Sequence, residues 1–326
     1  MAAFRRIDEF RGRQRVQAGS LIVSLFGDAA LPRGGRIWLG SLIRLLEPLG
    51  VNERLVRTSV FRLVKERWLR SETLGRRADY LLTDAGRRRF DAASAQIYSS
   101  RAPDWDRRWR LILLLGPLDT RERERLRRAL AWQGYGAVGG ECFVHPRADL
   151  AATLDALAGD GLEAQLECLM PLLAADAGAG MASGHAELVA RAWNLDAIGH
   201  AYQAFVDAYE PALRDLRGAR RDELADETAF LMRLLLIHDY RRLFLRDPEL
   251  PEALLPEAWP GRRARQLCRE IYRRLLVPSE RHLDAQFQLA DGRRTRSDES
   301  LDARFPAEDP LQGIDAPVAT ARLPAT

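Results

Sequence analysis

The stretch VNERLVRTSVFRLVKERWLRSETLGRRADYLLT (Val51–Thr83) decides the fold of the amino-terminal third of the chain. Asn52 is a favourable N-cap, because its side-chain oxygen can accept a hydrogen bond from a free amide of the first helical turn, and Glu53 suits the positive end of the helix dipole. Apolar residues then recur at helical spacing, and two short strand-like runs follow around a Gly-Arg-Arg loop. The pattern predicts a helix over 52–65 and a basic hairpin over 68–82.

Two further helices are predicted upstream, over about 18–27 and 38–46, between breaks that contain Gly and Pro. Three helices followed by a hairpin is the order of a winged helix-turn-helix, in which the third helix enters the DNA major groove and the hairpin contacts phosphates or the minor groove. The candidate DNA contacts are Asn52, Arg54, Arg57, Thr58, Ser59, Arg62, Lys65, Arg76 and Arg77. The plainer alternative is an amphipathic helix whose basic face is only solvated.

The charge distribution favours a polyanionic partner for this region. Residues 1–100 hold 19 Lys and Arg against 10 Asp and Glu, whereas the remaining residues hold 31 against 36. The net charge of +4 therefore combines a basic amino-terminal region with an acidic remainder. A basic surface gains affinity for nucleic acid through counterion release. Charge by itself does not separate DNA from RNA or from an anionic membrane.

Four segments of this region resemble the amino-terminal module of the PaaX family, the transcriptional repressors of phenylacetic acid degradation operons. They are SLIVSLFGD (20–28), GGRIWLGSLIRLL (34–46), GVNERLVRTSVFRLVKERWL (50–69) and GRRADYLLTDAG (75–86). The resemblance continues in WDRRWRLILL (105–114) and RRLFLRDPELPEALLPEAWPG (241–261), so it spans most of residues 15–285. It implies repression without catalysis, a middle domain like the CRISPR-associated small endoribonuclease fold, and release from DNA by phenylacetyl-CoA.

Beyond a linker near Pro103, strand-like and helical segments alternate. Strands are predicted over 109–115, 137–144 and 162–169, with helices over 119–132 and 150–157, an order typical of a small ferredoxin-like sandwich. From about Ala186 the chain is helical, with a central buried helix over 228–245, and beyond about Leu289 its composition favours disorder. The expected fold class is α+β, with a winged helix-turn-helix (1–100), a ferredoxin-like middle domain (101–176), a helical effector-binding domain (177–288) and a disordered tail (289–326).

Asp119 is the only carboxylate placed for a metal role after the first of these strands, which leaves a metal-dependent nuclease as an alternative function. Asp119 with Glu122 three residues later also matches a helix capping box. A single carboxylate makes a poor magnesium site, and no HExxH, HxH or CxxC spacing occurs among the five histidines and three cysteines. We therefore expect capping, no metal site, no cofactor and no enzymatic activity.

The predicted buried helix ends in a cluster of aromatic and basic residues. An apolar cavity rimmed by guanidinium groups would suit an acyl-coenzyme A, with its phosphates outside and its acyl group inside, and the resemblance to PaaX-type repressors makes phenylacetyl-CoA the expected effector. The candidate effector-binding residues are His238, Tyr240, Arg241, Arg242, Arg246 and Trp259. Core packing and solvated charge are the alternative explanation for each of them.

The sequence thus predicts a ligand-responsive repressor that occludes a promoter by binding double-stranded operator DNA. One module covers a half-site and operators commonly mirror protein symmetry, so a homodimer is expected. No window approaches 18 uninterrupted apolar residues, and the start MAAFRRIDEF lacks the apolar core of a signal peptide, so we expect a cytoplasmic protein without a membrane partner. The alternative to a small effector is a DNA-tethered scaffold whose acidic body binds another protein.

Overall fold

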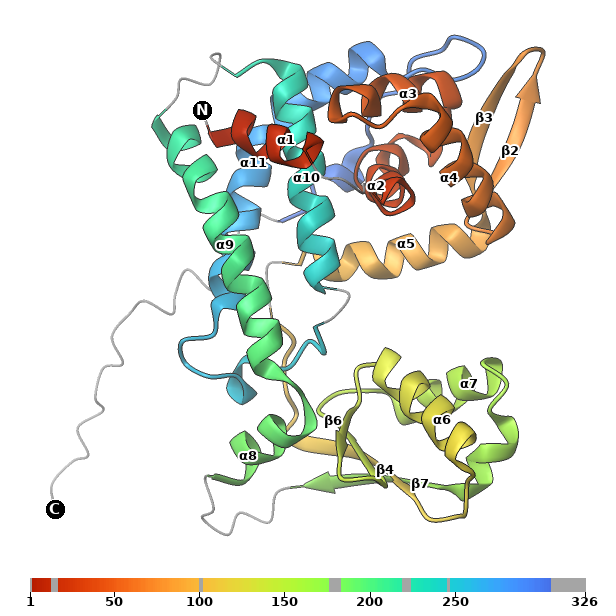
Figure 1. Cartoon of the computed structure of the whole chain (residues 1–326), viewed down its shortest axis with the longest axis vertical. Helices are drawn as coiled ribbons and strands as arrows, with labels where there is room; N and C mark the ends of the chain where they lie inside the picture. The colour runs from red at the N-terminus through yellow and green to blue at the C-terminus, as the bar shows by residue number, and fades with distance from the viewer. Residues whose placement is uncertain are drawn as a thin grey trace, which may run out of the picture. The chain divides into compact units, whose positions relative to one another are not determined.

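The computed structural model describes residues 2–12, 17–99, 102–175, 183–218, 224–244 and 247–305 (Figure 1). The described residues form two compact units. The hairpin unit consists of Val16–Arg101 with Glu280–Thr326, and the body unit consists of Met1–Arg15 with Ala102–Ser279. Both units combine helices and strands, so the α+β class predicted from the sequence is confirmed.

The hairpin unit is built on three helices followed by a hairpin, at the places that the sequence predicts. These elements are α2 (Ala18–Leu25), α3 (Leu39–Leu46), α4 (Glu53–Lys65), β2 (Leu69–Leu74) and β3 (Arg77–Leu82). Helix α2 packs against α4, and α3 contacts both α4 and the hairpin. A short π-helix (Phe26–Ala30) continues α2, and α5 (Asp84–Ile97) follows the hairpin with Thr83 as its N-cap. The apolar core of these elements includes Leu21, Ile22, Leu25, Leu42, Leu46, Val56 and Val60.

A third strand, β1 (Arg36–Trp38), pairs antiparallel with β3 and gives a sheet of order β1-β3-β2. The sequence does not predict β1, because three residues are too few to show a clear alternation. The turn before it contains Gly34 and Gly35, whose φ angles of 91° and 71° lie in the left-handed region that favours glycine.

The carboxyl-terminal segment corrects a prediction. Disorder is expected beyond Leu289, but residues 289–305 pack within the hairpin unit. The guanidinium of Arg304 donates to the carbonyl oxygens of Asp28 and Gly27, each at 2.7 Å, and Phe305 is fully buried beside Tyr98. These partners lie far away in the sequence, so the polar composition of the segment does not reveal them. Residues 306–326 of the predicted tail lie outside the described residues.

A second prediction, that the amino-terminal domain includes the start of the chain, is wrong, because residues 2–12 do not belong to the same unit as residues 17–99. Helix α1 (Ala2–Arg11) is part of the body unit, where it packs against α9 (Leu195–Gly218) and α10 (Asp226–Phe244). Its residues Ile7 and Phe10 are buried there. The predicted amino-terminal domain of 1–100 therefore begins after α1.

The body unit contains a four-stranded antiparallel sheet of order β5-β6-β4-β7. Its strands are β4 (Arg108–Leu114), β5 (Gly136–Val138), β6 (Cys142–His145) and β7 (Leu169–Ala175). Helices α6 (Thr120–Trp132) and α7 (Leu150–Gly159) cover one face, over a core that includes Ile112, Leu126, Leu130, Phe143 and Leu157. Helix α8 (Ser183–Ala192) packs on the residues that point the other way, including Trp109 and Val144.

Two strand predictions in this sheet were wrong in detail. The run over 137–144 is divided between β5 and β6, with Gly139 at a φ of 69° in the turn between them. The run over 162–169 is mostly a 3-10 helix (Glu163–Cys168), and the last strand is β7 instead. Leu162 and Leu166 are four residues apart and both reach the α6–α7 core, so their spacing reflects a helical turn rather than strand alternation.

Where it is described, the body unit beyond residue 183 is mostly helical, as predicted. Helix α10 is buried along most of its length, which confirms a central buried helix. A loop with one 3-10 turn (Glu252–Leu254) leads to α11 (Pro260–Gln286), which continues through Pro278. The residues of α11 up to Ser279 belong to the body unit, and those from Glu280 onward belong to the hairpin unit.

Candidate nucleic-acid interface

Helix α4 carries most of the predicted DNA contacts, and its predicted N-cap is confirmed. The side chain of Asn52 accepts a hydrogen bond from the amide of Leu55 at 2.9 Å. Val56, Val60 and Leu63 are buried on the inner side of the helix. The cap and this apolar stripe fix which side of α4 faces the core, and therefore which side faces outward.

The outward side of α4 is a basic stripe. Its exposed residues follow one another in steps of three or four, which places them on one face of the helix: Arg54, Thr58, Phe61 and Lys65. Arg57 and Arg62 flank this stripe and pair with Glu53 at 2.6 Å and Glu66 at 2.7 Å. Exposed pairs of this kind contribute only about 0–1 kcal/mol. Each guanidinium can therefore exchange its carboxylate for a phosphate or a base edge at small cost.

Two residues of α4 differ from the interpretation of the sequence. Ser59 is half-buried and lies beside Gly19 of α2, because its position on the helix is close to that of Val56 and Val60. This predicted DNA contact is therefore not on the exposed face. Phe61, which sequence reasoning missed, is 72% exposed in the middle of the basic stripe. On a helix that enters the major groove, an exposed apolar ring can pack against a thymine methyl group.

The tip of the hairpin holds two arginines in different surroundings. The turn Gly75–Arg76 joins the paired residues Leu74 and Arg77, and Gly75 adopts a φ of 58°. Arg76 is exposed and makes no ion pair with any described residue. The Cζ of Arg77 lies 4.7 Å from the ring centroid of Trp38, a cation–π contact. The tip thus presents one unpaired guanidinium and one that is braced against the sheet.

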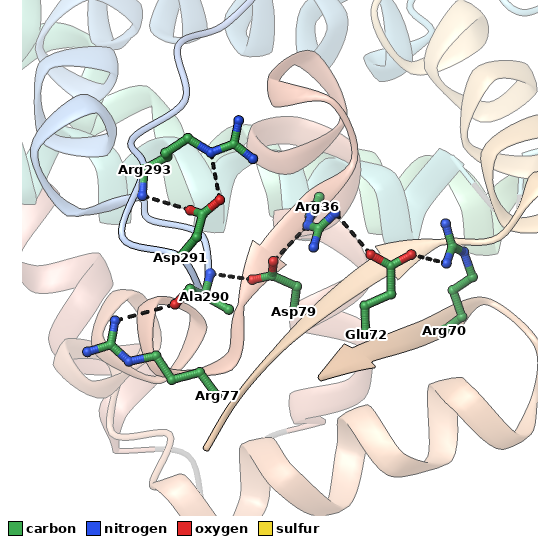
Figure 2. Close-up of polar contacts among 8 residues, drawn as sticks. All are labelled: Arg36, Arg70, Glu72, Arg77, Asp79, Ala290, Asp291 and Arg293. Atoms are coloured by element: carbon green, nitrogen blue, oxygen red, sulfur yellow. Dashed lines mark hydrogen bonds and ion pairs between the residues drawn. The ribbon is translucent and has the colours of Figure 1, made fainter. Parts of the chain in front are cut away.

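A chain of polar contacts holds one face of the hairpin sheet (Figure 2). Asp79, which is 1% exposed, accepts hydrogen bonds from Nε of Arg36 and from the amide of Ala290, each at 2.7 Å. The bond to Asp79 raises the pKa of Arg36. Arg36 also pairs with Glu72 at 3.0 Å, and Glu72 pairs with Arg70. Because Arg36 and the amide of Ala290 satisfy the buried carboxylate of Asp79, the position of the hairpin is well defined.

The predicted effector-binding residues lie in the body unit, and half of them are in its core. Three of the six are at most 8% exposed: His238, Tyr240 and Trp259. Arg241 and Arg242 are half-buried near the end of α10, while Arg246 lies outside the described residues. A hollow of about 310 Å³ in the same unit is lined by Ala190–Asp196 and includes none of the six. Tyr240 and Trp259 are thus packed among neighbouring side chains and do not line this hollow.

A buried polar cluster beside Trp259 was missed by sequence reasoning. The ring of Trp259 meets Tyr202 at 6.0 Å between centroids, and the Tyr202 hydroxyl donates to Asp247. Asp247 also accepts the amide of Glu249 at 2.8 Å. Burial raises the pKa of both carboxyl groups. Tyr202 and Asp247 are 45 residues apart, so no local pattern identifies the pair.

Asp119 has the structural role predicted for it. It accepts the amide of Glu122 at 2.8 Å, and the Glu122 side chain accepts the amide of Asp119 at 3.1 Å, which completes the capping box of α6. Within the described ranges, no group of three or more His, Cys, Asp or Glu residues is arranged to hold a metal ion.

The comparisons with known proteins agree with this geometry. The chain matches the family models of PaaX-like protein over residues 17–86, of the PaaX protein central Cas2-like domain over 102–174, and of the PaaX-like protein C-terminal domain over 193–285. It is 43% identical over 263 residues to the transcriptional repressor PaaX of Escherichia coli (strain K12), which covers 80% of this chain and 81% of the relative. The chain belongs to the PaaX family. The first match contains α4 and the hairpin, so the family resemblance predicted from these segments is confirmed.

The chain is also similar to proteins of known structure. An uncharacterized protein from Mycobacterium tuberculosis is 21% identical to this PaaX-family chain, with a TM-score of 0.46, and the match covers 73% of this chain and 88% of that chain. In the described part of the PaaX-family chain, every helix is too short or too polar to cross a lipid bilayer.

Proposed function

We propose that this protein is a transcriptional repressor that binds double-stranded operator DNA through the hairpin unit. The observation that carries the proposal is the exposed basic stripe of α4 next to a hairpin with Arg76 at its tip. The name of the curated relative, a transcriptional repressor, supports the same role. Repression requires only occupation of a promoter, so the protein needs no cofactor and catalyses no reaction.

In this proposal the hairpin unit is a winged helix-turn-helix, with α4 as the recognition helix and β2–β3 as the wing. A major groove about 12 Å wide admits one helix, and Arg57 and Arg62 are then placed to reach base edges. Arg76 and Arg77 contact phosphates or the minor groove.

The body sheet and its two covering helices follow one another along the chain as β4-α6-β5-β6-α7-β7. They are proposed to form a ferredoxin-like sandwich that serves as a spacer or dimerisation unit. A homodimer would match the two half-sites of a symmetric operator. The capping role of Asp119 supports a middle domain without catalysis.

Selection from random duplexes, followed by fluorescence anisotropy at a fixed salt concentration, tests the DNA-binding role. We expect a preferred duplex with two half-sites, bound about 10³–10⁷ times more tightly than a scrambled duplex of the same composition. The slope of log K against log salt should report several phosphate contacts. Equal affinity for all duplexes would contradict a sequence-specific repressor.

The proposed effector is an aryl-CoA, with phenylacetyl-CoA first, and the proposed targets are genes of phenylacetate catabolism. The family membership supports the ligand, and the half-buried Arg241 and Arg242 near aromatic residues support the site. Because Tyr240 and Trp259 are packed in the core, an acyl group can enter between such rings only if they move apart. The effector would thus favour a rearranged body unit, and it releases DNA only to the extent that it prefers that arrangement.

Calorimetry on the full chain tests the effector. Phenylacetyl-CoA should bind more tightly than coenzyme A or phenylacetate alone, because only the intact compound offers both the phosphates and the ring. A variant with Arg241→Ala and Arg242→Ala should bind it more weakly, whereas Arg127→Ala with Arg128→Ala on the exposed side of α6 should not. Equally weak binding of the three compounds would contradict an aryl-CoA effector.

A further inference from the structure

The segment that follows α11 forms a tight turn within the hairpin unit. Gln288 and Arg294 form an antiparallel bridge, the amide of Leu289 donates to the carbonyl oxygen of Arg293 at 2.9 Å, and Gly292 adopts a φ of 87°. We call residues 288–296 the carboxyl-terminal turn. It lies beyond residue 285, where the last family match ends.

Hydrogen bonds with both the hairpin sheet and α3 hold the carboxyl-terminal turn in place. Gln288 accepts the amide of Trp38 through its carbonyl oxygen and donates its own amide to Oγ of Ser41, each at 3.1 Å. The amide of Ala290 donates to the buried Asp79 at 2.7 Å, and Arg77 Nη1 donates to the carbonyl oxygen of Ala290 at 3.5 Å. Figure 2 shows the segment running beside the hairpin at this point. The turn is therefore fixed within hydrogen-bond distance of Arg77, at the hairpin tip.

The outer part of the turn is basic. Arg293, Arg294 and Arg296 are all exposed. Arg293 is committed to Asp291, which accepts its amide at 2.9 Å and its Nε at 2.6 Å. The side chains of Arg294 and Arg296 make no hydrogen bond or ion pair with any described residue. Two unpaired guanidinium groups thus stand on a backbone that is already ordered, so little backbone entropy remains to be lost when they bind.

We propose that the carboxyl-terminal turn is a third DNA-contacting element, in which Arg294 and Arg296 bind backbone phosphates beside those bound by the hairpin. The inference rests on the proposed function, because it is the hairpin that brings the turn to DNA. Guanidinium groups suit phosphate oxygens, which they can contact in a bidentate manner. Such contacts add affinity and salt dependence to every duplex alike and carry no base preference.

The test is the salt dependence of binding to the selected duplex. Each phosphate contact contributes about 0.9 to the slope of log K against log salt, so a variant with Arg294→Ala and Arg296→Ala should show a slope less steep by about 1.8. The variant with Arg294→Lys and Arg296→Lys keeps both charges and should retain most of the slope. Arg127→Ala with Arg128→Ala removes two exposed charges from the body unit and should leave the slope unchanged.

An unchanged slope in the Arg294→Ala, Arg296→Ala variant, with a melting temperature equal to that of the wild type, would overturn the inference. A parallel loss of slope in the alanine and lysine variants would also overturn it, because charge would then not be the cause. Failure of the proposed function looks different, since the wild-type protein would then show no preferred duplex at all. Retained specificity with a reduced slope is the result that supports the turn as a phosphate contact.

Discussion

Acidification should destabilise the body unit through His145, at the end of β6. Nδ1 of this imidazole accepts two backbone amides, from Arg147 at 2.9 Å and from Ala148 at 2.7 Å. Burial lowers the pKa of His145 from 6.5 to about 4, and the nearby positive charges of Arg147 and Arg110 act in the same direction. The folded protein therefore holds the imidazole neutral, with Nδ1 as the acceptor, in a pH range where the unfolded chain already binds a proton.

The sign and size of the effect follow from this difference in pKa. A depressed pKa in the folded state means that the stabilising contribution is complete above about pH 6.5 and is lost as the pH falls toward 4. The gap between 6.5 and about 4 corresponds to about 3 kcal/mol in the free energy of unfolding. Asp247 and Glu249, whose pKa values are raised by burial, act oppositely and favour the folded state as the pH falls. A comparison of variants is therefore needed to isolate His145.

Urea unfolding followed by tryptophan fluorescence from pH 8 to pH 4.5 provides the comparison. His145→Asn places an amide oxygen near the position of Nδ1 and does not titrate. We expect the wild type to lose about 2–3 kcal/mol more than this variant over the range. His200→Gln, at an exposed position in α9, should follow the wild type. If the wild type and His145→Asn lose stability in parallel, the two hydrogen bonds from backbone amides to Nδ1 do not control the acid response.

Three further outcomes are expected. Asp119→Ala should cost about 0.5–2 kcal/mol of stability through the lost capping box, measured by thermal unfolding, and a change in operator affinity would argue against a purely structural role. Asn52→Ala should cost about 1 kcal/mol and also weaken operator binding, because it frays the start of α4; intact binding with a lower melting temperature would place that end of the helix away from DNA. Phe61→Ala should lower operator affinity about fourfold, the factor for one buried methyl group. A duplex in which deoxyuridine replaces the contacted thymidine should then bind wild type and this variant alike, and additive losses would refute the contact.

Features set by neighbouring residues could be predicted from the sequence. The N-cap of α4 and the capping box of α6 each connect residues three apart, so the pattern of residue types suffices. The basic hairpin is also local, because Leu69–Leu74 and Arg77–Leu82 pair across a two-residue turn. The apolar spacing in α4 also predicted which of its residues are exposed. Ser59, which is half-buried, is the exception.

Features set by distant contacts could not be predicted. The carboxyl-terminal turn is ordered by Asp79, which lies 211 residues before Ala290, while its own composition is polar. The place of α1 depends on Arg6, which pairs with Asp239 across 233 residues. The burial of Tyr240 depends on rings such as Phe205 of α9. The aromatic and basic residues near position 240 could therefore be recognised as a cluster in the sequence. The sequence could not show that their rings pack in the core instead of lining an open cavity.

The most direct test of the account is the operator affinity of a variant with Arg57→Ala and Arg62→Ala, measured by fluorescence anisotropy against the selected duplex. Both residues lie on the outward side of α4, where their present ion pairs are exposed and weak. Each substitution should cost about 1–3 kcal/mol if the arginine reads a base edge, and the preference over a scrambled duplex should fall with it. The matched variant Arg127→Ala with Arg128→Ala should bind as the wild type does. Wild-type affinity and specificity in the Arg57→Ala, Arg62→Ala variant would contradict the assignment of α4 as the recognition helix.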